Sequence, residues 1–165
     1  MLSALALREQ VIVRLAALSG MRPGEILALK LRDFRGAELI VERRLYRFNL
    51  DVPKNTRSKR KVALSKGTQQ ALETWIEHAF ISDPEQWLFP SERYTPLTRD
   101  NLWRRQLQPK LETVGLEWAN FQVMRRTYAT WSKDIGVDAH TRSAQMGNTM
   151  NVNENEYAVA TFEQK

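Results

Sequence analysis

The chain has 165 residues, enough for one domain, residues 1–165, with its own hydrophobic core. Its 25 lysines and arginines exceed its 19 aspartates and glutamates, and the formal net charge of +6 favours a polyanionic partner, although a solvated surface can carry the same surplus. The lack of cysteine excludes disulfides, thiolate metal sites and cysteine nucleophiles, the two histidines are too few for a histidine metal cluster, and no apolar run is long enough to span a bilayer.

The N-terminal part of the chain predicts two helices joined by a sharp elbow. Apolar residues recur at helical spacing over residues 7–18, and Gly20 suits the left-handed residue that ends such a helix. Pro23 suits the first turn of the next helix, so Arg22 is held at the elbow. There its guanidinium can grip a phosphate or lie on the surface, and Glu25 can favour the helix dipole, orient Arg22, or both.

The residues after Gly36 favour β structure. Residues 39–41, 45–50 and 59–64 predict the strands of one small antiparallel sheet, with a polar turn at 55–58. Several cations gather around this turn. Such a cluster is typical of a solvated hairpin as well as of a hairpin that binds an anion.

The second half of the chain predicts further helices. Ser65 can cap a helix that reaches Phe80, and Thr98 can cap another that ends at Leu107. Three more are expected over residues 109–114, 138–146 and 154–162, the last of which carries Tyr157. A tyrosine at such a position is ordinarily a packing residue.

Residues 121–131 predict a helix whose apolar stripe includes Val123, Met124, Thr127 and Trp131, all facing inward. Arg125 lies beside this stripe. A half-buried arginine needs an anionic partner, because an unpaired buried charge costs several kcal/mol, on the order of 3–5. The partner could be a structural carboxylate or the phosphate of a ligand.

Several separated blocks resemble, in the same order, the catalytic domain of the tyrosine recombinase (phage integrase) family. Residues 20–29 are similar to the first box, which implies that Arg22 is a catalytic arginine and Glu25 its supporting residue. Residues 53–62 are similar to the hairpin that carries the catalytic lysine, which would be Lys54.

The remaining blocks follow in the C-terminal part of the chain. Residues 122–130 are similar to the second box and imply that Arg125 is the second catalytic arginine, and Tyr157 has the spacing of the nucleophile. The chain departs from the family at Gln122, where a histidine is usual, and at Asn148, where a histidine or tryptophan is usual. Neither amide can titrate, so we expect these two residues to position the phosphate without transferring protons.

The resemblance implies a mainly α-helical domain with a small antiparallel β-sheet (α+β), the family's catalytic-domain fold. It also implies site-specific recombination, in which Tyr157 attacks a DNA phosphodiester and leaves a 3′-phosphotyrosyl link and a free 5′-hydroxyl. Arg22 and Arg125 would stabilise the charge on the phosphate, and Lys54 would protonate the leaving oxygen. No metal or nucleotide cofactor is expected, because one ester bond replaces another.

The resemblance further implies that double-stranded DNA is the partner. We expect cations near the site to contact DNA, namely Arg57, Lys59, Arg60 and Arg126. Family members usually act as homotetramers on paired sites and carry an N-terminal core-binding domain absent from this chain, so a monomer with weak, salt-dependent DNA binding is expected. The resemblance also implies a bacterial or phage protein that acts in the cytoplasm and is associated with the nucleoid, not with a membrane.

Two alternatives stay open on the sequence alone. The departures at Gln122 and Asn148 would suit a catalytically weakened or inactive DNA-binding relative. The same chemistry would also suit a strand-passage activity like that of type IB topoisomerases.

Overall fold

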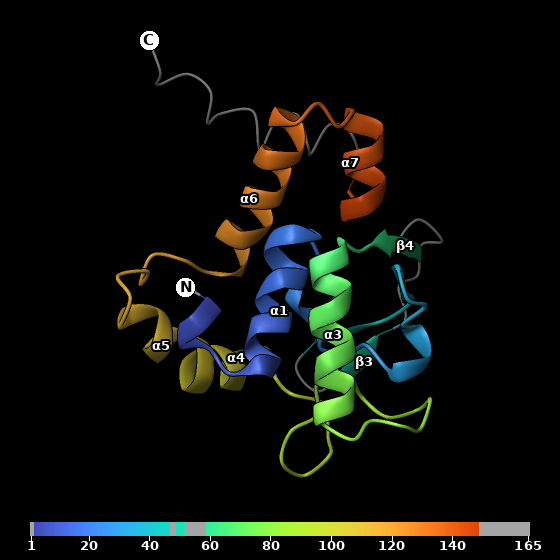
Figure 1. Cartoon of the computed structure of the whole chain (residues 1–165), viewed down its shortest axis with the longest axis vertical. Coiled ribbons are helices and arrows are strands. Elements are labelled where there is room, and N and C mark those ends of the chain that lie inside the picture. The colour runs from blue at the N-terminus through green and yellow to red at the C-terminus, as the bar shows by residue number, and fades with distance from the viewer. Residues whose placement is uncertain (1, 47–48, 52–58, 149–165) are drawn as a thin grey trace.

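The computed structural model describes residues 2–46, 49–51 and 59–148 (Figure 1). Its helices are α1 (Leu7–Leu18), α2 (Pro23–Ile26), α3 (Lys66–His78), α4 (Arg99–Leu102), a π-helical turn η4 (Trp103–Leu107), α5 (Gln108–Glu112), α6 (Phe121–Asp134) and α7 (Ala139–Met146), with short 3₁₀ turns at Leu2–Ala4 and Leu31–Asp33. Its strands are β1 (Glu38–Val41), β2 (Arg44–Tyr46), β3 (Asn49–Asp51) and β4 (Arg60–Ala63). Within these residues, no helix has the length and apolar character needed to cross a membrane.

Helix α1 lies at the centre of the described fold (Figure 1). It packs against both α3 and α6, and in Figure 1 α3 lies beside it while α6 extends beyond its upper end. Val11, Ile12 and Leu15 are fully buried, as expected for a helix that is apolar around most of its circumference. The central helix therefore fixes the position of the elbow that follows it.

The predicted elbow is confirmed. Gly20 has a φ of +66°, a left-handed conformation that glycine adopts without the strain of a Cβ atom. Pro23 is the first residue of α2, and Arg22 precedes it in an extended conformation. The main-chain N–H of Arg22 donates to Glu25 Oε2 over 3.0 Å, so the carboxylate caps the start of α2.

Side-chain caps begin the predicted helices of the second half. Ser65, Thr98 and Asp138 each accept a hydrogen bond from a main-chain N–H in the first turn of α3, α4 and α7. The helix predicted over residues 154–162 lies outside the described residues.

The prediction of a single sheet was wrong in one respect. Strands β1 and β4 pair antiparallel, with Leu39 opposite Val62, whereas β2 pairs separately with β3. The stretch 45–50 was expected to be one strand, but Leu45 lies opposite Leu50 in this second pair. Alternating apolar residues fit two short strands facing each other as well as they fit one longer strand.

The inward orientation predicted for Trp131 was also wrong. Its exposed fraction is 56%, although Met124, one heptad earlier on the same face of α6, is 4% exposed. The next residue, Ser132, is only 5% exposed, so the packing of α6 does not end before Trp131. The buried face instead passes through Arg125, Ala129 and Ser132, which shows that the predicted apolar stripe is rotated away from the face that packs.

We predict that Gly20→Ala lowers the free energy of unfolding by about 2–5 kcal/mol. A left-handed residue with a Cβ costs about 1–2 kcal/mol, and overpacking adds about 1–3 kcal/mol. The added Cβ would lie 2.6 Å from Cδ1 of Tyr128. Urea denaturation measures the loss. Gly36→Ala is the matched control, because Gly36 has a φ of +67° and no atom within 4 Å of an added Cβ. Equal losses in the two variants would contradict the steric part of the prediction.

Candidate active site

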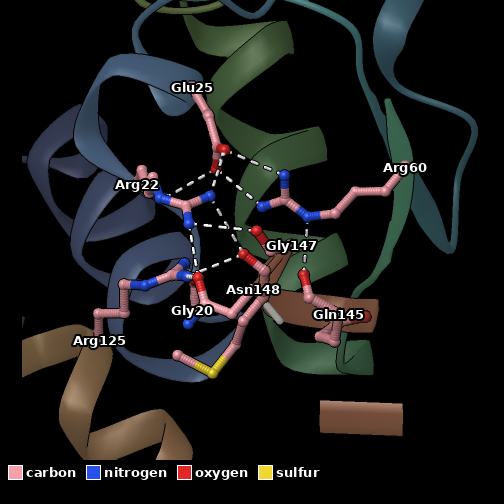
Figure 2. A network of polar contacts seen from close by, with 9 residues as sticks. Gly20, Arg22, Glu25, Arg60, Arg125, Gln145, Gly147 and Asn148 are labelled. Carbon is pink, nitrogen blue, oxygen red and sulfur yellow. Dashed lines mark hydrogen bonds and ion pairs between the residues drawn. The ribbon is translucent and has the colours of Figure 1, made fainter. Parts of the chain in front are cut away.

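Three arginines from separate elements meet around the elbow (Figure 2). Arg22 precedes α2, Arg60 begins β4, and Arg125 lies on the first half of α6. Their guanidinium groups point toward one another and toward the turn that follows α7, where Asn148 lies. The elements in between bring together cations that are far apart in the sequence.

Arg22 is held by acceptors on two sides. Its Nη1 donates to Glu25 Oε1 over 3.1 Å, and its Nη2 donates to the carbonyl oxygen of Gly147 over 3.2 Å and to Asn148 Oδ1 over 2.5 Å. The side chain is nonetheless 44% exposed. A held but accessible guanidinium can receive an anion from solvent without a large loss of side-chain entropy.

Arg125 is buried, with an exposed fraction of 7%. Its Nη1 donates to the carbonyl oxygen of Gly20, and its Nη2 donates to the carbonyl oxygen of Met146 over 2.8 Å and to Asn148 Oδ1 over 2.7 Å. These acceptors are neutral carbonyl oxygens. They orient the guanidinium toward Asn148 and the turn that follows α7.

Asn148 joins the two arginines through a single atom. Its Oδ1 accepts from Nη2 of Arg22 and from Nη2 of Arg125. The space between the two guanidinium groups is therefore the size and shape that one oxygen atom requires. An oxygen of a phosphate would meet the same donors there.

Glu25 is buried, with an exposed fraction of 6%, and it pairs with two of the arginines. Arg60 binds it through both nitrogens of its fork, at 3.0 Å to Oε1 and 2.8 Å to Oε2, and Arg22 adds a third ion-pair contact. Burial alone would raise the pKa of Glu25, but the hydrogen bonds and charges of Arg60 and Arg22 outweigh it and hold the pKa below its ordinary value of 4.5. Glu25 is therefore ionised at neutral pH.

A cavity of about 580 Å³ opens beside this cluster. Four of the predicted site residues line it together, namely Arg22, Gln122, Arg125 and Asn148. Gln122 is exposed at the start of α6, where the side chain of Asn120 caps the helix. The cavity is large enough for a phosphate together with neighbouring atoms of a ligand.

The cavity is also lined by residues that sequence reasoning missed. Arg99 and Arg104 line it with Asp100, and the rings of Trp103 and Phe121, 5.6 Å apart, supply an apolar surface. The cluster of basic residues in 99–105 could have indicated a site for an anion. A cluster of charges on a short helix does not show, however, whether its side chains face a cavity or solvent.

The structure describes three of the four cations predicted to contact DNA, and they differ in exposure. Lys59 and Arg126 are exposed. The side chain of Arg60 is 7% exposed and donates only to protein acceptors among the contacts described, a burial that does not fit direct contact with DNA. Counting cations near a turn could not reveal that Glu25 draws one of them inward. Lys54, Arg57 and Tyr157 lie outside the described residues.

Within the described part of the chain, no three histidine, aspartate or glutamate side chains gather as metal ligands would. The polar side chains that line the cavity are guanidinium and amide groups together with a single carboxylate, that of Asp100, so positive charge predominates. Such a lining suits an anion.

The sequence of the chain matches a model of the phage integrase family over residues 2–162. No curated protein matches it.

Solved structures share the fold. The integrase of the transposon Tn1549, in complex with transposon right end DNA, is 20% identical with a TM-score of 0.75, over 92% of this chain and 56% of that one. XerA recombinase is 18% identical with a TM-score of 0.76, over 98% and 58% of the two chains. XerH recombinase, bound to its difH substrate before cleavage, is 20% identical with a TM-score of 0.66, over 96% and 48%. The chain thus spans about half the length of these proteins, and the predicted catalytic-domain fold is confirmed.

We predict that two replacements of Asn148 differ in their effect on stability. Asn148→Ala removes two hydrogen bonds to charged donors, each worth about 1.5–3 kcal/mol, and should lower the free energy of unfolding by at least about 1.5 kcal/mol. Asn148→Asp places a carboxylate between the same two guanidinium groups. At neutral pH the urea concentration at its unfolding midpoint should be at least as high as that of the unsubstituted chain. If the aspartate variant were as unstable as the alanine variant, the shared oxygen would not be a favourable contact.

Proposed function

The chain belongs to the phage integrase family, and from this membership and the geometry of the cavity we propose that it cuts and rejoins double-stranded DNA as a site-specific tyrosine recombinase. One observation carries the proposal: Arg22 and Arg125 meet on a single oxygen atom, Asn148 Oδ1. A nonbridging oxygen of a DNA phosphate placed at this point would receive two charge-assisted hydrogen bonds.

The proposed reaction needs no more than the groups this chain carries. The phenol oxygen of Tyr157 attacks the phosphorus atom, the bond to the 5′ oxygen breaks, and Lys54 gives that oxygen a proton. The two arginines stabilise the charge that spreads over the nonbridging oxygens during in-line displacement. Attack by the 5′-hydroxyl on the phosphotyrosyl link reverses the step and rejoins a strand.

Binding of the phosphate would exchange one oxygen for another. The anion displaces Asn148 Oδ1, while the carbonyl oxygens of Gly20 and Met146 continue to hold Arg125, and Glu25 continues to hold Arg22. The arginines therefore keep their orientation during the exchange, which limits the reorganisation needed at the moment of reaction.

The amide of Gln122 changes how the nucleophile can be activated. Gln122 lines the cavity and can donate a hydrogen bond to the phosphate, but it cannot take a proton from Tyr157. A phenol with an ordinary pKa of about 10 is a weak nucleophile at neutral pH, so the neighbouring cations must favour the phenolate. We propose that this chain cleaves more slowly than a relative with histidine at the position of Gln122.

The wider setting of the reaction is part of the same proposal. The net charge of +6 supports a polyanionic partner, and the integrase and XerH structures that share the fold contain DNA. We propose that the whole protein assembles as a homotetramer on paired sites. We also propose that it is a bacterial or phage protein that acts on DNA in the cytoplasm.

A trapped covalent link tests the proposal. The substrate is a pool of short duplexes with random sequence on both sides of one modified linkage. In this linkage sulfur replaces the bridging 5′ oxygen, so cleavage releases a thiol that rejoins the strand poorly. We expect an adduct that survives detergent, persists in EDTA and is absent from Tyr157→Phe. DNA binding without an adduct would support the inactive relative. Relaxation of supercoiled DNA without strand exchange would support the topoisomerase-like alternative.

We predict that Gln122→His raises the single-turnover rate of cleavage at pH 7.5. A positioned general acid or base contributes about a hundred- to ten-thousand-fold, and a neutral imidazole here would recover part of that factor, at least about tenfold. Gln122→Asn keeps an amide and is the control that should show no gain. An unchanged or lower rate in the histidine variant would refute the assigned role of position 122.

A further inference from the structure

On the basis of the proposed function, we propose that Arg60 is a positioning residue that joins the elbow, strand β4 and the turn after α7 into one rigid unit around the phosphate site. It acts through Glu25 and Gln145 and does not touch the substrate. Its role therefore differs from that of Arg22 and Arg125, which line the cavity.

The donors of Arg60 all turn inward. Nη1 and Nη2 contact the two oxygens of Glu25, at 3.0 and 2.8 Å, and Nε donates to the carbonyl oxygen of Gln145 over 2.9 Å. One planar group thus binds a residue of α2 and a residue of α7 at once (Figure 2). A lysine could not reproduce this arrangement, because its charge has no planar fork.

Arg60 reaches Arg22 through a shared carboxylate. Oε1 of Glu25 accepts from Nη1 of Arg60 and from Nη1 of Arg22, and Oε2 accepts from Nη2 of Arg60 and from the main-chain N–H of Arg22. The carboxylate can rotate only if both arginines move. The direction of the Arg22 guanidinium therefore depends on Arg60.

The turn after α7 is held by the same side chain. Gly147 has a φ of +66°, and a Cβ at this position would lie 2.8 Å from Nη1 of Arg60, so the guanidinium lies directly against the backbone. The side chain of Gln145 adds a second link to β4, with Nε2 at 2.9 Å from the carbonyl oxygen of Ala63 and Oε1 at 3.0 Å from its N–H. This turn presents Gly147 and Asn148 to Arg22.

Arg60 also fixes the strand that follows Lys54 in the sequence. It is the first residue of β4, which pairs with β1. One side chain therefore ties the strand that follows the proposed general acid to the elbow that carries Arg22. A shift of about 1 Å in such groups can cost about a hundredfold in rate.

A second buried pair provides a matched control. Arg43 and Asp33 are 7% and 3% exposed, and their side chains are joined by two contacts of 2.5 and 3.2 Å. Neither residue lines the cavity. Arg43→Met therefore removes a buried guanidinium from a carboxylate, as Arg60→Met does, but away from the site.

The experiment compares Arg60→Met, Arg60→Lys and Arg43→Met in the intact chain. Single-turnover cleavage of the sulfur-substituted pool is measured at saturating protein and divided by the folded fraction. We expect Arg60→Met to lose about a hundredfold, Arg60→Lys to lose less, and Arg43→Met to keep its rate despite lower stability. If Arg60→Met proves unfolded, Arg60→Lys carries the comparison. A full rate in the folded arginine-60 variants would overturn the proposal.

A pH profile separates positioning from a general loss of stability. Among the residues that the structure describes, Arg22 and Arg60 are the charged groups that face Glu25, so removal of Arg60 should raise the pKa of this buried carboxylate. The rate of Arg60→Met should then fall as the pH drops from 8 to 5.5, more steeply than that of the unsubstituted chain. In the double variant Arg60→Met with Glu25→Gln this extra fall should vanish. Parallel profiles would overturn the proposal.

Hydrogen exchange tests the inference without cleavage. Amide protection over residues 60–63 and 143–148 should drop together in Arg60→Met and stay unchanged in Arg43→Met. If the unsubstituted chain forms no adduct, the proposed function fails while this measurement still decides the role of Arg60. Unchanged protection over both segments would overturn it.

Discussion

The buried carboxylate of Glu25 is the constraint on which the site depends. Taking a carboxylate out of water costs several kcal/mol, on the order of the 3–5 kcal/mol lost when a buried pair is broken, and this cost is met only by close, well-directed partners. Glu25 has two guanidinium groups and a main-chain N–H within 3.1 Å. With Arg125 nearby, the cluster retains a net positive charge. The arrangement leaves the site cationic and held in place, which suits the binding of a singly charged anion.

Local backbone chemistry brings these groups together. Two of the arginines stand at a boundary between elements, Arg22 before Pro23 and Arg60 at the first residue of β4, whereas Arg125 lies within the first half of α6. Main-chain carbonyl oxygens at two left-handed turns, those of Gly20 and Gly147, accept from Arg125 and Arg22. Ends of helices leave carbonyl groups without helical partners, so they are natural acceptors for such side chains.

Sequence reasoning succeeded where one residue or its neighbours decide the structure. The left-handed Gly20 and the caps at Ser65 and Thr98 follow from local preferences, and the resemblance identified four residues that line one cavity. It failed where distant contacts decide. The burial of Arg60 depends on a carboxylate in another element, and the face of α6 that is buried, with Ser132 at 5% and Trp131 at 56% exposed, depends on the elements that pack against it. No periodicity or charge count contains that information.

The amide of Gln145 has a consequence for the edge of the sheet. A two-stranded sheet leaves outward-facing N–H and C=O groups that can template pairing with another polypeptide. At Ala63 both of these groups are already occupied by one side chain of the same molecule. At this residue the edge of β4 therefore has no free main-chain donor or acceptor to offer to a further strand, because the Gln145 amide takes the place that such a strand would occupy.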